Sequence, residues 1–329
     1  MSMRAVSYTR TGAAAEVLEH TPLPHPGPPA PGEVLVRVAV SGVNPSDAKT
    51  RAGARGPLAF ARIIPHSDGA GRIEAVGNGV DPARVGQRVW MWNAAWGRAQ
   101  GTCAEFVTLP AAQAVPLPEA ARVEDGACLG IPAQTAHRCL FADGDIAGQD
   151  VLVTGGAGTV GAYAVQMARL AGARVIATAS TPDKAAHARA MGADAVVDYR
   201  APDAAEQIRA ATGGRGIDRI VEVEFGGNLA ITRAVLRDNG IVAAYGSMAA
   251  PEPALPFYPM MFAGQTLRMV LVYKLPADAR RHAITDITRW LEAGALRHPV
   301  AHCFALEATA AAHDAVLAPG RIGAVLVRV

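Results

Sequence analysis

The chain has 329 residues, about twice the usual size of one domain, so we expect two domains. Half of the residues are hydrophobic and 18% are charged, which excludes a disordered chain. The 31 basic and 29 acidic residues leave a net charge of +2 with no long run of one sign, so we expect no nucleic-acid partner.

The cysteines and the apolar segments indicate the compartment. The 4 cysteines form neither a CxxC pair nor a disulfide framework, which is typical of a reducing cytoplasm. No apolar run reaches the roughly 18 residues of a membrane span, and the N-terminus has no apolar signal segment. We therefore expect a cytoplasmic protein that does not bind membranes.

The first third of the chain predicts short strands at residues 34–40, 69–76, 88–92 and 102–109. A strand-like segment begins at the N-terminus, and a proline-dense stretch at 21–32 lies between it and the strand at 34–40. The stretch is compatible with a polyproline ligand for a partner domain or with a stiff surface connection between two strands. The connection is favoured because nothing else in the sequence suggests signalling.

From about residue 150 the pattern changes to strands alternating with helices. The expected strands are 151–153, 174–179, 195–198, 218–223 and 240–245, and the expected helices are 159–171, 182–191, 203–211 and 228–236. A strand at 267–272, helices at 278–292 and 307–317, and a strand at 324–327 follow. Short apolar runs alternating with amphipathic segments predict an α/β fold, with a doubly wound parallel sheet of Rossmann type inserted into a β-rich domain.

The strongest local motif follows the strand at 151–153. Gly156, Gly158 and Gly161 satisfy the spacing GxGxxG, at the junction where a strand ends and a helix begins. There a phosphate meets free backbone N–H groups and the positive end of the helix dipole. The motif predicts a dinucleotide site; a tight turn with a close helix–strand contact is the alternative.

The end of the second strand indicates which dinucleotide binds. An NAD site has an acidic residue about 20 positions after the first glycine, but residues 177–180 contain none. Ser180, Lys184 and Tyr199 are suited instead to a 2′-phosphate, which an acid would repel. We therefore predict NADPH as the cofactor. In the alternative interpretation, Lys184 and Arg200 are solvated surface charges.

Residues 267–273 predict an apolar strand at the edge of the cofactor sheet. Soluble proteins seldom leave such an edge open, and a two-fold axis beside it would join two sheets into one. We expect a homodimer; in the alternative, the helix at 278–292 covers the edge.

Several segments together carry a family resemblance. They are GVNPSD at 42–47, SDGAGRIEAVG at 67–77, GTCAEFV at 101–107, GIPAQTA at 130–136, the glycine loop, GAD at 192–194 and GRIG at 320–323. In this order they resemble the medium-chain dehydrogenase/reductase superfamily and, within it, the zinc-free quinone oxidoreductases related to zeta-crystallin. The resemblance covers nearly the whole chain. It implies a GroES-like catalytic domain at 1–124 and 265–329 and a Rossmann dinucleotide-binding domain at 125–264, and it points to the same dimer.

The resemblance also implies roles for single residues. Asn44 faces the nicotinamide and the substrate, and its side-chain NH₂ is the candidate donor to the developing oxyanion. Lys49, Trp92 and Ile131 are expected at the substrate, with Lys49 standing where relatives often carry a Tyr; the tryptophans at 90–96 fit a core or a lid equally well. The expected cofactor-binding residues are Asn44, Pro45, Thr135, Gly156, Ala157, Gly158, Thr159, Val160, Ser180, Lys184, Tyr199, Tyr245, Gly246, Ser247, Leu271, Val272 and Arg321.

The zinc-dependent branch of the superfamily differs at its metal ligands. Where that branch has Cys, a Gly-His-Glu and a second Cys, this chain has Asn44, Ser67 and Ile131, and His66 is one residue out of register. Zinc prefers thiolate and imidazole ligands in tetrahedral arrangement, so we expect no metal.

These inferences predict a zinc-independent NADPH-dependent oxidoreductase that transfers hydride to a quinone. A quinone accepts hydride without a Lewis acid, and the final proton can come from water. Two alternatives stay open: an NADPH-dependent reductase of enones or alkenals, and a non-catalytic NADPH-binding protein.

Overall fold

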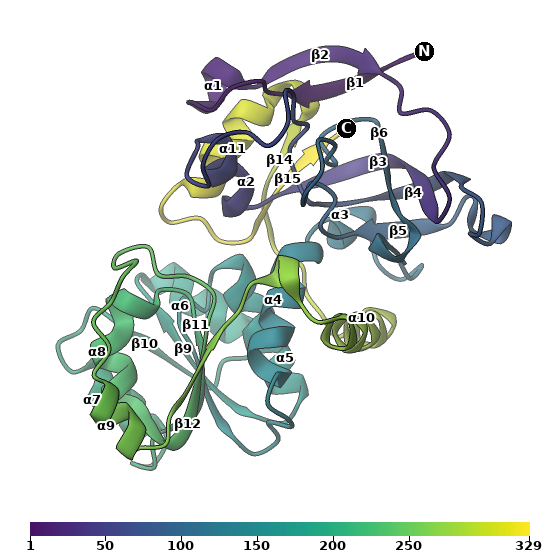
Figure 1. Cartoon of the computed structure of the whole chain (residues 1–329). Coiled ribbons are helices and arrows are strands. Elements are labelled where there is room, and N and C mark those ends of the chain that lie inside the picture. Colours follow the sequence, from purple (N-terminus) through teal and green to yellow (C-terminus); the bar gives the residue numbers. More distant parts are fainter. The chain divides into compact units, whose positions relative to one another are not determined.

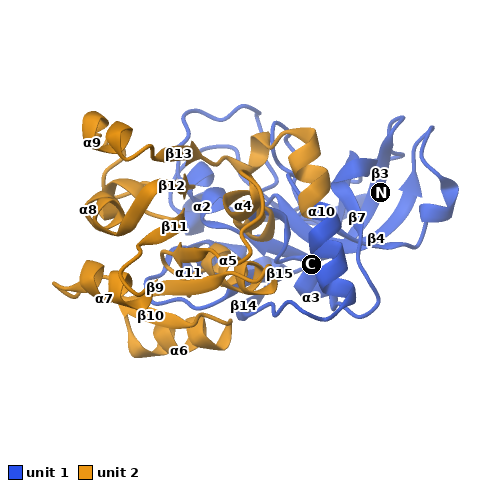
Figure 2. Cartoon of the chain, turned by 90° about the horizontal axis from the view of Figure 1, so that it is seen from below, with its two compact units in different colours: residues 1–131, 284–329 blue, residues 132–283 orange.

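The computed structural model describes the whole chain, residues 1–329. They form two compact units (Figure 2): unit 1 comprises Met1–Ile131 and Ile284–Val329, and unit 2 comprises Pro132–Ala283. Two helices, α4 (Gly130–Phe141) and α10 (Ala277–Glu292), run through the unit boundaries, so no loop marks them in the sequence. The domain boundaries expected at 124 and 264 lie before these points.

Unit 2 is built on a parallel sheet of six strands in the order β10-β9-β8-β11-β12-β13 (Figure 1). This is the doubly wound order of a dinucleotide-binding sheet, which confirms the expected fold. The strands are β8 (Asp150–Val153), β9 (Arg174–Ala179), β10 (Ala195–Asp198), β11 (Ile217–Glu222), β12 (Leu236–Ala244) and β13 (Thr266–Met269). Besides α4 and α10, its helices are α5 (Thr159–Leu170), α6 (Pro182–Ala190), α7 (Ala204–Ala211), α8 (Phe225–Val235) and α9 (Phe257–Phe262), with a 3₁₀ turn η3 (Val272–Lys274).

The expected edge strand at 267–273 is shorter in the structure. β13 does lie at the sheet edge, but its pairing with β12 ends at Met269, opposite Ala244. β12 ends there, and only one further bond, from Val270 N–H to the Ala244 carbonyl, continues along the edge. The chain then turns into η3, so Leu271 and Val272 lie outside the strand.

Unit 1 holds a seven-stranded sheet, mostly antiparallel, and a separate two-stranded sheet. The large sheet has the order β14-β15-β3-β4-β5-β7, with β6 paired to β3, and the small sheet joins β1 to β2. The strands are β1 (Ser2–Ser7), β2 (Glu19–Pro24), β3 (Glu33–Val43), β4 (Asp68–Val76), β5 (Arg88–Met91), β6 (Phe106–Pro110), β7 (Ala114–Pro116), β14 (Val300–Ala305) and β15 (Ala324–Arg328). The helices are α1 (Ala14–Val17), α2 (Pro45–Arg51), α3 (Val123–Gly126) and α11 (Thr309–Leu317), with 3₁₀ turns η1 (Pro82–Arg84), η2 (Ala111–Gln113) and η4 (Leu306–Ala308).

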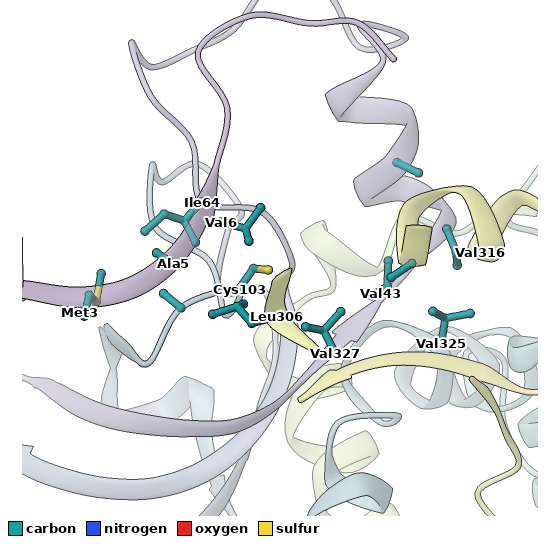
Figure 3. Packing of buried hydrophobic residues seen from close by; sticks show 13 residues of the cluster. Met3, Ala5, Val6, Val43, Ile64, Cys103, Leu306, Val316, Val325 and Val327 are labelled. Carbon is teal, nitrogen blue, oxygen red and sulfur yellow. The ribbon is translucent and has the colours of Figure 1, made fainter. Parts of the chain in front are cut away.

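The core of unit 1 joins the two ends of the chain (Figure 3). Val6 from β1 and Val43 from β3 belong to the same buried cluster as Val316 from α11 and Val325 and Val327 from β15. Burying one such side chain stabilises the fold by about 1.5–3 kcal/mol. The C-terminal segment is therefore part of the same domain as the N-terminal third, as the sequence predicts.

The proline-dense stretch begins inside a strand. Pro22 and Pro24 belong to β2, opposite Arg4 and Ser2 of β1, and only the rest of the stretch connects β2 to β3. Proline lacks an N–H and is tolerated where a strand forms a sheet edge. The interpretation as a connection between strands is thus correct only for its second half.

No helix combines the length and the apolar character needed to cross a membrane.

Candidate active site

The glycine loop of unit 2 links the end of β8 to α5. Gly158 is the N-cap residue of α5 and has no side chain that could cap the N–H groups of the first helical turn. Gly155 adopts a positive φ of 63°, and its carbonyl accepts a bond of 2.9 Å from Gly158 N–H. Gly156 N–H is bonded to the Thr178 carbonyl of the β9 strand (3.0 Å). The loop is therefore held by the neighbouring strand and leaves a helix N-terminus for an anion.

The three motif glycines serve different purposes. A Cβ at Gly161 would lie 2.3 Å from the Gly155 carbonyl oxygen, and one at Gly156 would lie 2.7 Å from the Ala177 Cβ. A Cβ at Gly158 would meet nothing in the protein closer than 3.3 Å. Gly156 and Gly161 allow close packing of the helix against the strand, whereas Gly158 leaves the surface at the helix N-terminus uncovered by a side chain. A dinucleotide pyrophosphate fits this cradle.

The base of the loop is tied to β11 through a buried acid. Glu222 Oε1 accepts bonds from Thr154 Oγ1 (2.8 Å), from Glu224 N–H (2.6 Å) and from Asn228 Nδ2 (2.9 Å). Burial raises the pKa of Glu222 despite these bonds. Sequence reasoning missed this residue, although an acid at the carboxyl end of a parallel strand was the available signal.

The carboxyl ends of β9 and β10 bring the predicted 2′-phosphate residues together. Asp198 lies opposite Ala179 in the paired strands, so Ser180 and Tyr199 follow at the same sheet edge. The Arg200 guanidinium donates to the Ser180 carbonyl and to Asp198 Oδ1 (3.2 Å), which lowers the pKa of Asp198. Lys184 stands in the first turn of α6, where its N–H is bonded to Thr181 Oγ1 (3.3 Å).

The turn after β12 contains three further predicted residues. Tyr245 N–H is bonded to the Glu222 carbonyl (3.0 Å), and a Cβ at Gly246 would lie 2.3 Å from the Val223 carbonyl oxygen. Ser247 Oγ accepts from Gly226 N–H (2.9 Å). The neighbouring N–H groups of residues 248 and 249 donate to the Glu224 carboxylate, at 2.7 and 2.9 Å. The turn is fixed at the same sheet edge as the glycine loop.

A buried arginine holds the segment after β13. Arg280, 6% exposed, donates from Nη2 to the Val272 carbonyl (2.6 Å) and from Nη1 to Gln134 Oε1 (2.7 Å). Burial lowers the pKa of Arg280 to about 10. Gln134 precedes the buried Thr135 in α4, so the guanidinium connects two segments that the resemblance assigns to the nicotinamide.

In unit 1, Asn44 lies at the N-terminus of α2, directly after β3. It is 6% exposed, and its Nδ2 donates to Asp68 Oδ2 (2.8 Å). Asp47 Oδ2 accepts from the Asn44 backbone N–H (2.8 Å), and Pro45 occupies the first helical position.

Two buried carboxyl groups therefore hold Asn44. Burial raises the pKa of Asp47 to about 7, and burial together with the nearby Asp47 raises the pKa of Asp68 to about 8. Burial therefore favours the neutral form of Asp68 near pH 7. Its role was missed from the sequence, because only the fold brings it to Asn44.

His66 lies beside this cluster and adopts a positive φ of 78°. Its Nε2 is 2.9 Å from His313 Nε2, and its Nδ1 is 2.8 Å from Ser41 Oγ. Burial lowers the pKa of both imidazoles, to about 3 for His313. His66 is thus paired within the core of unit 1, as a structural residue.

The remaining predicted residues of unit 1 have diverse environments. Lys49 lies in α2, Trp92 follows β5, and Ile131 donates its backbone N–H to Asp68 Oδ2 (2.8 Å). Arg321 donates to the Val316 carbonyl (3.3 Å) and to the Gly323 carbonyl. Around Trp92, Trp90 is fully buried and Trp96 is 40% exposed. The substrate and cofactor roles of these residues remain predictions.

Comparison with known proteins adds to this geometry. The model of the alcohol dehydrogenase GroES-like domain matches residues 30–119, and the model described as zinc-binding dehydrogenase matches residues 159–291. The quinone oxidoreductase of Sus scrofa is 30% identical over 290 residues, which cover 88% of this chain and 86% of the relative. The 2-haloacrylate reductase of a Burkholderia species is 31% identical over 339 residues, covering 99% and 98%. A solved mycobacterial structure complexed with NADPH has a TM-score of 0.88 at 28% identity, covering 99% of this chain and 100% of that one.

A GroES-like domain, a doubly wound sheet and a glycine loop define a medium-chain dehydrogenase/reductase, an NAD(P)-dependent oxidoreductase. Within this superfamily the chain belongs to the quinone oxidoreductases, the group that its sequence resembles.

Proposed function

We propose that the chain is an NADPH-dependent reductase that transfers hydride to a quinone without a zinc ion. The observation that carries the proposal is the carboxyl edge of the unit 2 sheet. There the N-terminus of α5, capped by Gly158, lies at the same edge as Ser180 and Tyr199, and residues 177–180 carry no acid. Two acids lie nearby: Asp198, which is paired with Arg200, and Asp183, which precedes Lys184 in the first turn of α6.

Different groups of the chain bind the cofactor and contact the substrate. The N–H groups of the first turn of α5 bind the pyrophosphate, and Lys184 and Tyr199 bind the 2′-phosphate. The bound cofactor supplies hydride. The Asn44 carboxamide donates an N–H to the substrate oxygen, which gains negative charge as hydride arrives. Hydride and one proton from water convert the quinone into a hydroquinone.

Zinc does not fit the residues present. The positions that carry zinc ligands in the zinc-dependent branch are Asn44, Ser67 and Ile131 here, and none of them offers a thiolate or an imidazole. No group of 3 or more His, Cys, Asp or Glu side chains could hold a metal ion. We therefore assign no step to a metal.

A reductase of enones or alkenals is the second candidate. It is favoured by the similarity to a 2-haloacrylate reductase along 99% of the chain. An activated carbon–carbon double bond accepts hydride in the same way as a quinone and also builds up charge on a carbonyl oxygen. A non-catalytic NADPH-binding protein is the third candidate, and turnover of any acceptor would exclude it.

The deciding experiment follows NADPH oxidation with 1,4-benzoquinone and with a panel of alkenals, each with and without a chelator. We expect faster turnover with the quinone and no effect of the chelator. Faster turnover of the alkenals would favour the second candidate. Loss of activity with the chelator would overturn the zinc-free mechanism.

We further propose that the protein forms a homodimer along β13. The strand is short, but apolar side chains are exposed on it and on helix α9 just before it: Phe262 is 81% exposed, Met269 70% and Phe257 66%. An exposed apolar edge of this kind favours pairing with a second copy. Light scattering at micromolar concentration should give about twice the chain mass of 34.0 kDa. A monomer would contradict the dimer without affecting the cofactor assignment.

A further inference from the structure

Asp68 is the first residue of β4 and is fully buried. One of its oxygens, Oδ2, accepts two bonds of 2.8 Å, one from Asn44 Nδ2 and one from Ile131 N–H. The three residues come from the end of β3, the start of β4 and the start of α4. One carboxyl oxygen thus connects two residues that the family resemblance places at the substrate.

The surrounding backbone is shaped to admit this carboxyl group. A Cβ at Gly130 would lie 2.1 Å from Asp68 Oδ1, and a Cβ at Gly42 would lie 2.1 Å from the Ala127 carbonyl oxygen and 3.1 Å from the Asp68 Cβ. Any other residue at position 130 would displace the carboxyl group from its place. Two glycines from different segments therefore leave room for Asp68.

The contact decides which end of the Asn44 carboxamide is available. An acceptor oxygen pairs with the amide nitrogen and repels the amide oxygen, so Asp68 Oδ2 fixes the rotation of the group. One N–H of Asn44 is used in this bond, and the side chain also forms a hydrogen bond with Asp47, so a substrate oxygen competes with Asp47 for the second N–H. Without Asp68 the amide loses its buried acceptor, and only its contacts with Asp47 and with the α2 backbone are left to hold its rotation.

We propose that Asp68 is a positioning residue, which orients the Asn44 carboxamide so that an N–H, and not the carbonyl, meets the substrate oxygen. The inference rests on the proposed function, because it assigns Asn44 as the donor to the oxyanion. Asp68 does not itself touch the substrate. Its effect on turnover passes entirely through Asn44.

Two substitutions separate this role from a purely structural one. Asp68→Asn keeps the shape and an acceptor oxygen, and its neutral amide matches the neutral carboxyl group that burial produces at pH 7. Asp68→Leu keeps the branched shape and removes the acceptor. We expect Asp68→Asn to retain kcat for 1,4-benzoquinone within about threefold and Asp68→Leu to lower it about 100-fold, the usual cost of one lost oxyanion donor. The Kd for NADPH, from fluorescence titration, should change less than about twofold in both, since the glycine loop lies in unit 2.

A double-mutant cycle with Asn44→Ala tests whether the effect passes through Asn44. Asn44→Ala alone should lower kcat about 100-fold. Adding Asp68→Leu should lower kcat no further. If the double variant loses kcat by the product of the two single losses, Asp68 does not act through Asn44. A kcat of Asp68→Asn as low as that of Asp68→Leu would also overturn the positioning role. Both results would leave the proposed function intact. Wild-type activity in Asn44→Ala would overturn the catalytic role of Asn44, and with it the positioning role of Asp68. A wild-type protein that is inactive with every acceptor would overturn the proposed function as well.

Discussion

Each unit has functional groups of its own, and those of the two units differ in kind. In unit 2 the glycine loop offers backbone N–H groups at a helix end, and its neighbours matter mainly through the space they leave. In unit 1 the contribution is a side chain, Asn44, held by two buried carboxyl groups from its own helix and from β4. A backbone site is sensitive to an added Cβ atom, whereas a buried side-chain site is sensitive to protonation. Each of the predictions below perturbs one of the two.

The largest effect should come from pH acting on unit 1. The pKa of Asp68 is raised to about 8 in the folded protein, so between its unfolded value near 4 and pH 8 the folded state binds one proton more than the unfolded state. The free energy of unfolding then falls as pH rises through this range, by about 1.4 kcal/mol per pH unit for this group, and levels off above pH 8.

Asp68→Asn removes this titration. Relative to wild type, the variant should therefore gain stability in urea unfolding as pH rises from 5 to 8. Glu119→Gln is the control, because the Glu119 side chain is 91% exposed, and it should follow wild type. Parallel pH curves for wild type and Asp68→Asn would contradict a neutral buried Asp68.

The next effect concerns the glycines of unit 2. Gly161→Ala places a Cβ 2.3 Å from the Gly155 carbonyl oxygen, so it should destabilise unit 2 by up to about 3 kcal/mol through overpacking. Gly158→Ala places its Cβ 3.3 Å from the same oxygen, so it should lower Tm much less than Gly161→Ala while weakening NADPH binding. Thermal unfolding and fluorescence titration check the two variants. Equal losses of Tm in both would refute the division between packing glycines and a ligand-facing glycine.

The smallest effect concerns cofactor discrimination. Lys184→Ala should raise KM for NADPH much more than KM for NADH, by about 1–3 kcal/mol of lost charge-assisted contact. The lower end of this range is expected because Lys184 is only partly buried. Arg189→Ala, which removes an exposed cation from the other end of α6, is the matched control and should leave both KM values unchanged. Equal changes for both cofactors in Lys184→Ala would show that this residue does not bind the 2′-phosphate.

The same difference between the units explains what the sequence could predict. The sheet of unit 2 and its glycine loop depend on contiguous residues, so the alternation of strands and helices and the GxGxxG spacing were sufficient. The length of β13 was not predictable, because it depends on where its partner β12 ends. The pairing of His66 with His313 joins residues 247 positions apart, and Asp68 reaches Asn44 and Ile131 only in the folded sheet. Such contacts have no local signature in the sequence.

The antiparallel pairing of β15 with β3 has a consequence for biosynthesis. Val325 lies opposite Val43, so the strand that ends just before Asn44 acquires this neighbour only when the last residues of the chain have been synthesised. Unit 2 is continuous from Pro132 to Ala283 and can complete its sheet earlier. Residues 33–37 of β3 can already pair with β6 at that stage, but residues 40–43 still lack their partner strand β15. On the ribosome the backbone site for the cofactor is therefore assembled before the side-chain site that positions Asn44. A nascent chain that terminates before residue 324 carries the glycine loop but leaves residues 40–43 of β3 without their partner strand β15, which favours aggregation.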